Sequence, residues 1–130
     1  MEETTGATPI EARRVGDTAI IYASDYLNKL SGERIERECK RQLESGQHGV
    51  VINFRDTELV NSIGVSILMG VIDAAEQSRA RLIFCEVNSQ TASLFEMLGL
   101  AKHVRIAKDE GEAVAWIEGE NNTAATVHHA

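Results

Sequence analysis

Apolar residues along the chain recur with two different spacings, one typical of strands and the other of helices. Residues 50–54 and 81–87 are short, largely apolar runs rich in β-branched or aromatic side chains, as strands covered on both faces are. Residues 33–44, and the segment that begins near Ser62, instead place apolar side chains every three or four positions, the period of an amphipathic helix. The pattern predicts strands and helices in alternation.

The same pattern, read together with turn residues, supplies the other elements. Residues 13–15 and Thr18–Tyr22 flank the pair Gly16-Asp17, which is typical of a hairpin turn. The remaining predicted elements are a helix at residues 91–98, an edge strand at 104–106 and a last helix at 109–117 that begins with Asp109 as its N-cap. The order β-β-α-β-α-β-α-β-α predicts an α/β fold with a mostly parallel sheet and an antiparallel edge.

The charge of the chain argues against nucleic acid as a partner. Proteins that bind DNA or RNA gather lysine and arginine on one face, whereas this chain has a net charge of −7 and the basic residues within 33–44 are interleaved with glutamates. No apolar stretch has the length of a membrane span, and the first residues lack the apolar core of a signal peptide. We therefore expect a cytoplasmic protein without membrane insertion.

The chain length of 130 residues fits one domain with its own core. Residues 1–9 and 119–130 are polar and rich in small side chains, so we expect them to be disordered tails around a domain at residues 10–118. Cys39 and Cys85 lie within apolar patterns, without a CxxC motif or a nearby histidine. They are predicted to be small buried hydrophobes, and we expect neither a metal nor a cofactor.

The sequence contains no set of catalytic motifs that would indicate an enzyme. The glycine-rich phosphate loops, the nucleophile elbow of hydrolases and the zinc-binding HExxH pattern do not occur. His48 and His103 have no carboxylate or nucleophile partner close by in the sequence, so we expect them to be surface residues. The sequence favours a binding protein.

The most informative segment is residues 59–65, which joins the buried strand at 50–54 to the second helix. Ser62 stands at the start of that helix, beside backbone N–H groups without acceptors and the positive end of the helix dipole. In one interpretation Asn61 or Ser62 simply caps the helix, which is worth about 1 kcal/mol. In the other, the hydroxyl of Ser62 is exposed and phosphorylated, and the added charge prevents a partner from docking. The residues alone favour the first, because serine is common at helix starts.

The run from Val50 to Leu68 resembles the signature of STAS-domain anti-sigma-factor antagonists. That signature is an apolar strand with an asparagine, a short acidic loop, an apolar pair, and Asp-Ser-Ser/Thr-Gly-Leu-Gly opening a helix. The likeness extends to the helix end Met97-Leu98-Gly99-Leu100 and to residues 24–31, and it covers roughly residues 13–117. It implies the STAS fold, a mixed and mostly parallel sheet with an N-terminal antiparallel hairpin and helices packed mainly on one face.

The resemblance also implies a function, that of an anti-sigma-factor antagonist acting by partner switching. In this family the unphosphorylated form binds a GHKL-type ATPase that is both anti-sigma factor and serine kinase, and a sigma factor is released. Phosphorylation of the serine that corresponds to Ser62 blocks binding, and a serine phosphatase removes the phosphate. The implied docking residues are Asn28, Asn61, Ser62, Ile63, Gly64 and Val65.

Three positions depart from the family pattern. Asn61 replaces the aspartate before the acceptor serine, Ile63 stands where serine or threonine is usual, and Asn28 replaces an earlier aspartate. Asparagine keeps the shape of aspartate and loses its charge. These changes motivate a second hypothesis, a STAS scaffold subunit without phosphorylation, either stressosome-like or associated with a transporter. A third hypothesis, a small enzyme or nucleotide-binding domain, lacks a phosphate cradle.

Overall fold

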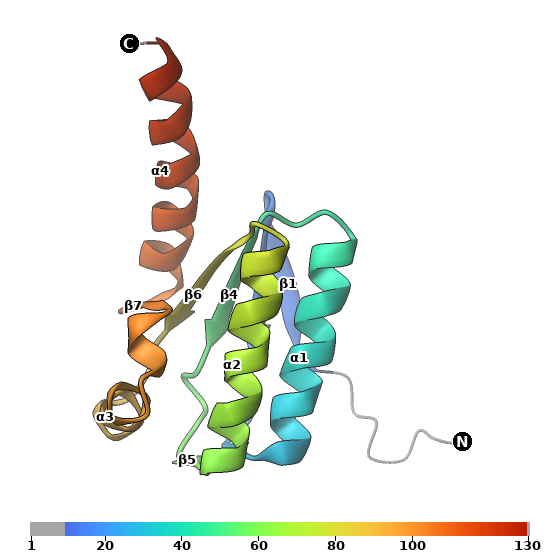
Figure 1. The fold of residues 1–130 in the computed structure, drawn as a ribbon, viewed down its shortest axis with the longest axis vertical. Helices are drawn as coiled ribbons and strands as arrows, with labels where there is room; N and C mark the ends of the chain where they lie inside the picture. Colours follow the sequence, from blue (N-terminus) through green and yellow to red (C-terminus); the bar gives the residue numbers. More distant parts are fainter. Residues whose placement is uncertain (1–9, 130) are drawn as a thin grey trace.

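A mixed five-stranded sheet forms the centre of the structure (Figure 1). The computed structural model describes residues 10–129, with side chains described for residues 10–119, so the predicted tail at residues 1–9 lies outside the described residues. The strand order is β1-β2-β4-β6-β7; β1 is antiparallel to β2, and the other neighbours are parallel. The strands are β1 Ala12–Val15, β2 Thr18–Tyr22, β4 Gly49–Asn53, β6 Arg81–Cys85 and β7 Arg105–Ala107.

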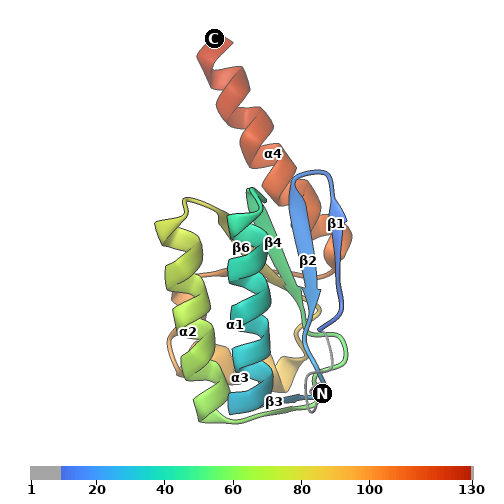
Figure 2. The same cartoon turned by 90° about the vertical axis from the view of Figure 1, so that its right-hand side faces the viewer.

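Helices cover the two faces of this sheet unequally. The helices are α1 Lys29–Glu44, α2 Ser62–Gln77, α3 Ser89–Met97 and α4 Glu110–His129, with a 3-10 turn, η1, at Leu100–Lys102. α1 and α2 lie side by side on one face, and α4 begins against the other (Figures 1 and 2). Because side chains alternate along a strand, Val50 and Ile52 enter the core under α1 and α2, while Val51 enters the core under α4. The predicted arrangement, with helices mainly on one face, is confirmed.

Three phenylalanines attach α3 to the core beneath α1 and α2. Phe54, Phe84 and Phe95 are buried, and their ring centroids lie 5.1 to 5.8 Å apart in edge-to-face or tilted contacts, a geometry that aromatic rings favour. The side-chain amide of Asn88, the N-cap of α3, also donates to the carbonyl oxygen of Thr57 at 3.1 Å. These contacts hold the start of α3 beside the loop that follows β4.

The predicted order is confirmed for the five strands of the main sheet and the four helices, and the differences are shifted element boundaries and one additional short ladder. α1 begins at Lys29 and not at residue 33, because Asn28 and Ser31 form a capping box that places Ser31 in the first helical turn. A two-stranded ladder of β3 Tyr26–Leu27 and β5 Leu59–Val60 was not predicted, since two residues are too few to show a periodicity. α4 continues to His129, past its predicted end at residue 117.

The two cysteines are fully buried, as predicted. Burial raises the pKa of the Cys39 thiol to about 11 and that of the Cys85 thiol to about 12. Both thiols are therefore protonated at neutral pH, and a protonated thiol is a poor nucleophile and metal ligand. Their role as small buried hydrophobes follows from this environment.

Glu110, the first residue of α4, ties this helix to the carboxyl ends of the central strands. Its Oε1 accepts from Nη2 of Arg13 at 2.5 Å, and its Oε2 accepts from Nδ2 of the buried Asn53 at 2.7 Å. Burial alone would raise the pKa of Glu110, but hydrogen bonds from Tyr22, Arg13 and Asn53 outweigh that effect and lower it. The ionised carboxylate thus stabilises the docking of α4.

We expect Glu110→Gln to lower the free energy of unfolding by about 1.5 kcal/mol at pH 7, the lower end of the contribution of about 1.5 to 3 kcal/mol that a hydrogen bond to a charged group makes, because the carboxylate is partly exposed. The pKa of Glu110 is lower in the folded than in the unfolded chain, so its contribution is complete above the unfolded value of about 4.3 and disappears as the pH falls through the folded pKa. Urea unfolding at pH 7 and near pH 3 should show the difference between variant and parent shrinking at the lower pH. The exposed Glu96→Gln is the control, and a difference independent of pH would contradict this account.

Candidate functional site

Ser62 is the first residue of α2, which begins at the end of the molecule where β3, β5 and the start of α1 lie (Figures 1 and 2). The residue is exposed, and its hydroxyl makes no hydrogen bond to any of the described residues. The N-cap of α2 is Asn61, whose Oδ1 accepts from the Gly64 N–H at 2.8 Å. The capping role that sequence left open between Asn61 and Ser62 belongs to Asn61, and the Ser62 hydroxyl is accessible.

The backbone at the start of α2 is suited to a negative charge. The first N–H groups of an α-helix have no acceptor within the helix. Here the Asn61 side chain accepts a hydrogen bond from one of them, the Gly64 N–H. The positive end of the helix dipole lies at the same place and favours anions such as phosphate. A phosphate on Ser62 would therefore be tolerated by the helix that carries it.

The short ladder of β3 and β5 fixes the start of α2 in space. Tyr26 pairs with Leu59 and Leu27 with Val60, while the carbonyl oxygen of Leu27 accepts from the Asn61 N–H at 2.9 Å. A Cβ atom at Gly64 would lie 2.7 Å from that same carbonyl oxygen. Only glycine lets α2 approach β3 this closely, so Gly64 positions the helix that presents Ser62.

Four large apolar side chains are exposed at this end of the molecule. They are Tyr26, Leu30, Leu59 and Ile63, with 39%, 57%, 63% and 54% of their surface exposed, and we call them the apolar patch. Tyr26 is also connected to the helix cap, because Nδ2 of Asn61 donates to its hydroxyl at 3.2 Å. Exposed apolar residues that gather on one part of a surface are typical of a site that binds another protein.

The structure keeps four of the six predicted docking residues at or near the surface. Ser62 and Ile63 are exposed, and Asn28 and Asn61 are half-buried. Asn28 serves as the N-cap of α1, where its Oδ1 accepts from the Ser31 N–H at 3.0 Å. Both amides that replace family aspartates are thus helix caps, a role that asparagine fulfils as well as aspartate.

The expectation that Gly64 and Val65 offer docking surface is wrong. Val65 has 3% of its surface exposed and packs in the core under α1 and α2. Gly64 is also buried, with its backbone against Leu27. Both residues lie on the side of the first turn of α2 that faces the body of the protein, so they support the site from within.

Sequence reasoning missed three residues of the apolar patch: Tyr26, Leu30 and Leu59. Leu30 lies in the first turn of α1, in a segment that was predicted to precede that helix. Tyr26 and Leu59 come together only through the unpredicted ladder of β3 and β5. The available signal was the presence of large apolar residues outside any periodic pattern in the segments that precede the predicted acceptor.

We expect Asn61→Ala to lower the free energy of unfolding by about 1 kcal/mol, because the Gly64 N–H would lose its acceptor. Asn61→Asp keeps the capping oxygen and adds a negative charge at a helix N-terminus, which stabilises by roughly 0.3 to 1 kcal/mol. The free energy of unfolding measured by urea denaturation at pH 7 should therefore be at least as high for Asn61→Asp as for the parent, and lowest for Asn61→Ala. A stable alanine variant would show that the cap does not hold the start of α2.

Other kinds of site find no support in the described part of the chain. No group of three or more histidine, cysteine, aspartate or glutamate side chains there could hold a metal ion. None of the helices, as far as they are described, combines the length and apolar character needed to cross a bilayer. His48 and His103 are exposed, as predicted.

Comparisons with known proteins agree on one family. The family model for the STAS domain matches residues 9–113. BtrV of Bordetella bronchiseptica, which is named as an anti-sigma factor antagonist, is 24% identical over 102 residues that cover 78% of this chain and 88% of BtrV. Unphosphorylated SpoIIAA from Bacillus, also named as an anti-sigma factor antagonist, has a TM-score of 0.71 at 21% identity, over 85% of this chain and 96% of SpoIIAA. A chain of the stressosome, described as a signal integration and transduction hub, has a TM-score of 0.71 at 14% identity, over 85% of this chain and 98% of that chain.

Proposed function

Because the chain belongs to the STAS domain family, we propose that it is an anti-sigma factor antagonist that works by partner switching. In its unphosphorylated form it binds an anti-sigma factor and thereby releases a sigma factor. Phosphorylation of Ser62 by that partner, a serine kinase of the GHKL ATPase type, prevents binding until a serine phosphatase restores the hydroxyl. The observation that carries the proposal is the exposed Ser62 hydroxyl beside the apolar patch.

The physical basis of such a switch is the contrast between the patch and a phosphate. The side chains of Tyr26, Leu59 and Ile63 gain free energy when a partner removes them from water. A phosphate on Ser62 adds a charge of roughly −1.5 to −2 at neutral pH, and closing an apolar interface over it would strip its water. The start of α2 tolerates the phosphate, so phosphorylation changes the surface far more than the fold.

The switch requires no catalytic group in this chain. The transferred phosphate would come from ATP bound to the partner, and the acceptor is the Ser62 hydroxyl. STAS relatives of this kind are generally not enzymes, and we assign the chain a binding function. The contribution of the chain to phosphorylation is the exposure of an acceptor that the helix cap does not use.

We expect the protein to gain one phosphate when it is incubated with ATP and an anti-sigma factor kinase encoded by the same organism. Intact-mass measurement should show this gain in the parent and not in Ser62→Ala. Ser66→Ala is the matched control, because Ser66 lies one turn further along α2 and is exposed, but its hydroxyl already donates to the Ser62 carbonyl oxygen. Phosphate on Ser62→Ala, or none on the parent, would contradict the proposal.

A second candidate function is that of a scaffold subunit without phosphorylation, and the environment of Asn61 favours it. No carboxylate precedes the acceptor serine, and both polar atoms of the Asn61 side chain are already engaged, one with Gly64 and the other with Tyr26. A scaffold subunit would assemble into a large particle whatever the state of Ser62. Light scattering of the purified chain and of its Ser62→Asp variant distinguishes the two functions, since a stable high-mass assembly in both supports the scaffold.

A further inference from the structure

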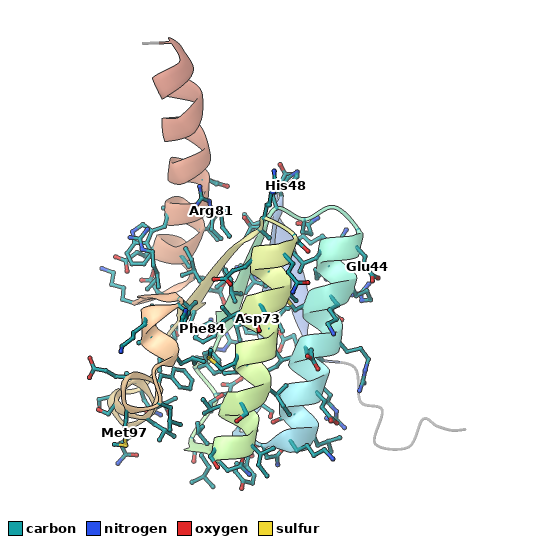
Figure 3. All side chains as sticks on the ribbon, in the orientation of Figure 1. Glu44, His48, Asp73, Arg81, Phe84 and Met97 are labelled. Atoms are coloured by element: carbon teal, nitrogen blue, oxygen red, sulfur yellow. The ribbon has the colours of Figure 1, made fainter. Side chains whose placement is uncertain are left out.

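A basic hollow lies at the end of α2 opposite Ser62. It is formed between the last turn of α2, the start of β6, the 3-10 turn η1 and β7, and its volume is about 320 Å³. A second hollow adjoins it, shares Glu76, Ala80 and Arg81 with it, and adds His48 and Arg79. His48 and Arg81 mark this end of the molecule in Figure 3.

The charge at this place is opposite to that of the chain as a whole. Four of the 13 lysine and arginine residues line the two hollows, together with two histidines and one acidic residue, Glu76. The four cations are Arg79, Arg81, Lys102 and Arg105. In a chain with a net charge of −7, such a concentration of positive charge attracts anions selectively to one place.

The four cations form the basic rim of the hollows, and two of them, Arg81 and Arg105, are held in position by other residues of the chain. The guanidinium of Arg105 lies over the ring of Trp116, 3.9 Å from its centroid, in the stacked geometry that arginine favours with aromatic rings. Arg81 and Arg105 are each engaged in further interactions within the chain. Side chains that are ordered before a ligand arrives lose less conformational entropy on binding it.

Part of the lining of the first hollow is apolar. Ala80, Leu82 and Ala101 border it and are half-buried, so they still offer apolar surface to a ligand. Cations beside apolar side chains fit an anion that carries an apolar group, and guanidinium groups match the geometry of phosphate oxygens. The volume lies at the lower end of the range of about 300 to 1,000 Å³ for small-molecule sites. We propose that this hollow binds a small phosphate ester.

This site is separate from the surface around Ser62. The 16 residues of α2 separate the two ends, a distance of about 24 Å at 1.5 Å per residue. A ligand in the hollow would leave the apolar patch uncovered. The proposal therefore goes beyond partner switching, and it can be tested on the isolated chain, without any partner and without phosphorylation.

The probe is phenyl phosphate, titrated into the isotope-labelled full chain and followed by the NMR signals of the backbone amides. We expect shifts confined to residues around the hollow, including Glu76, Lys102 and His103, with the signal of Ser62 unchanged. Inorganic phosphate should bind roughly fivefold more weakly, since it buries no apolar surface. Phenol, which lacks the charge, should produce no shifts there. Shifts spread over the whole surface, or equal affinity for phenyl phosphate and inorganic phosphate, would overturn the proposal.

Variants distinguish a built site from a general effect of charge. Lys102→Gln should raise the dissociation constant for phenyl phosphate roughly two- to fivefold, the effect expected of a single exposed ion pair. Arg79→Gln should have a smaller effect, because Arg79 lines only the adjoining hollow. Lys40→Gln removes the same charge from the exposed face of α1 and should leave the affinity unchanged. Equal weakening by Lys40→Gln would overturn the proposal. Tighter binding of a hexaglutamate peptide than of phenyl phosphate would also overturn the proposal, because it would indicate that this surface binds an acidic segment of a protein.

Discussion

Ser62→Asp is expected to weaken binding of the anti-sigma factor roughly 30-fold or more, the loss that about 2 kcal/mol at the centre of an interface produces. The aspartate places a negative charge beside Ile63 and the other side chains of the apolar patch, and closing the interface would strip that charge of water. Ser62→Ala removes only a hydroxyl that no described residue uses, so it should bind like the parent and remain bound in the presence of ATP. Calorimetric titration of each variant with the partner measures both effects.

The matched control for this charge is Ser78→Asp at the other end of α2. Ser78 is the exposed C-cap residue of the same helix, so the variant carries the same charge far from the apolar patch. Its affinity for the partner should stay within about twofold of the parent, because exposed charges beyond a Debye length of about 8 Å are largely screened. Equal affinities of Ser62→Asp and Ser62→Ala would remove Ser62 from the interface and leave the scaffold function as the better account.

The division of roles between two adjacent residues makes the proposed switch possible. Asn61 supplies the oxygen that caps α2, so Ser62 can change its chemistry without loss of the cap. Had Ser62 been the cap, phosphorylation would have altered the start of the helix as well as the surface. The replacement of the family aspartate by asparagine therefore preserves the structural part of the site and changes its charge.

The fold could be predicted from the sequence where the hydrophobic period is long enough to read. The strands at the centre of the sheet and the core face of α2 repeat their apolar positions several times, and both were predicted. The start of α1 was missed because the capping box of Asn28 and Ser31 brings a glycine into the first turn, and glycine there suggests a loop. Short elements and caps depend on particular hydrogen bonds, which composition does not reveal.

The candidate site was predictable only in part, for a similar reason. The position of Ser62 follows from a strand followed by a helix, and the sequence places it correctly. The apolar patch depends on Tyr26 and Leu59 lying opposite each other in a ladder of two residues. The orientation of Val65 depends on the rotation of α2 about its own axis, which is fixed by the contact between Gly64 and Leu27. The pairing of Tyr26 with Leu59 and the rotation of α2 both depend on tertiary contacts, which the sequence pattern does not reveal.

Gly64→Ala is expected to lower the free energy of unfolding by about 1 to 3 kcal/mol, the usual cost of overpacking a tight contact. The added Cβ would lie 2.7 Å from the Leu27 carbonyl oxygen and 2.8 Å from its carbonyl carbon. These are backbone atoms of β3, and the oxygen also accepts the Asn61 N–H, so they cannot move aside without loss of that bond. Alanine in a helix would otherwise gain up to about 1 kcal/mol over glycine, and the clash opposes that gain. Urea denaturation followed by circular dichroism measures the net effect.

Gly70→Ala on the same helix separates the clash from helix propensity. A Cβ at Gly70 would approach only Oε2 of Glu36, at 3.1 Å, and that flexible side chain can move. This variant should be neutral or more stable than the parent by up to about 1 kcal/mol. If the two variants had equal stability, the contact between α2 and β3 would not be what requires glycine. If Gly64→Ala remains folded, we also expect it to bind the anti-sigma factor more weakly, because α2 must move away from β3 and carry Ser62 and Ile63 away from Tyr26 and Leu59.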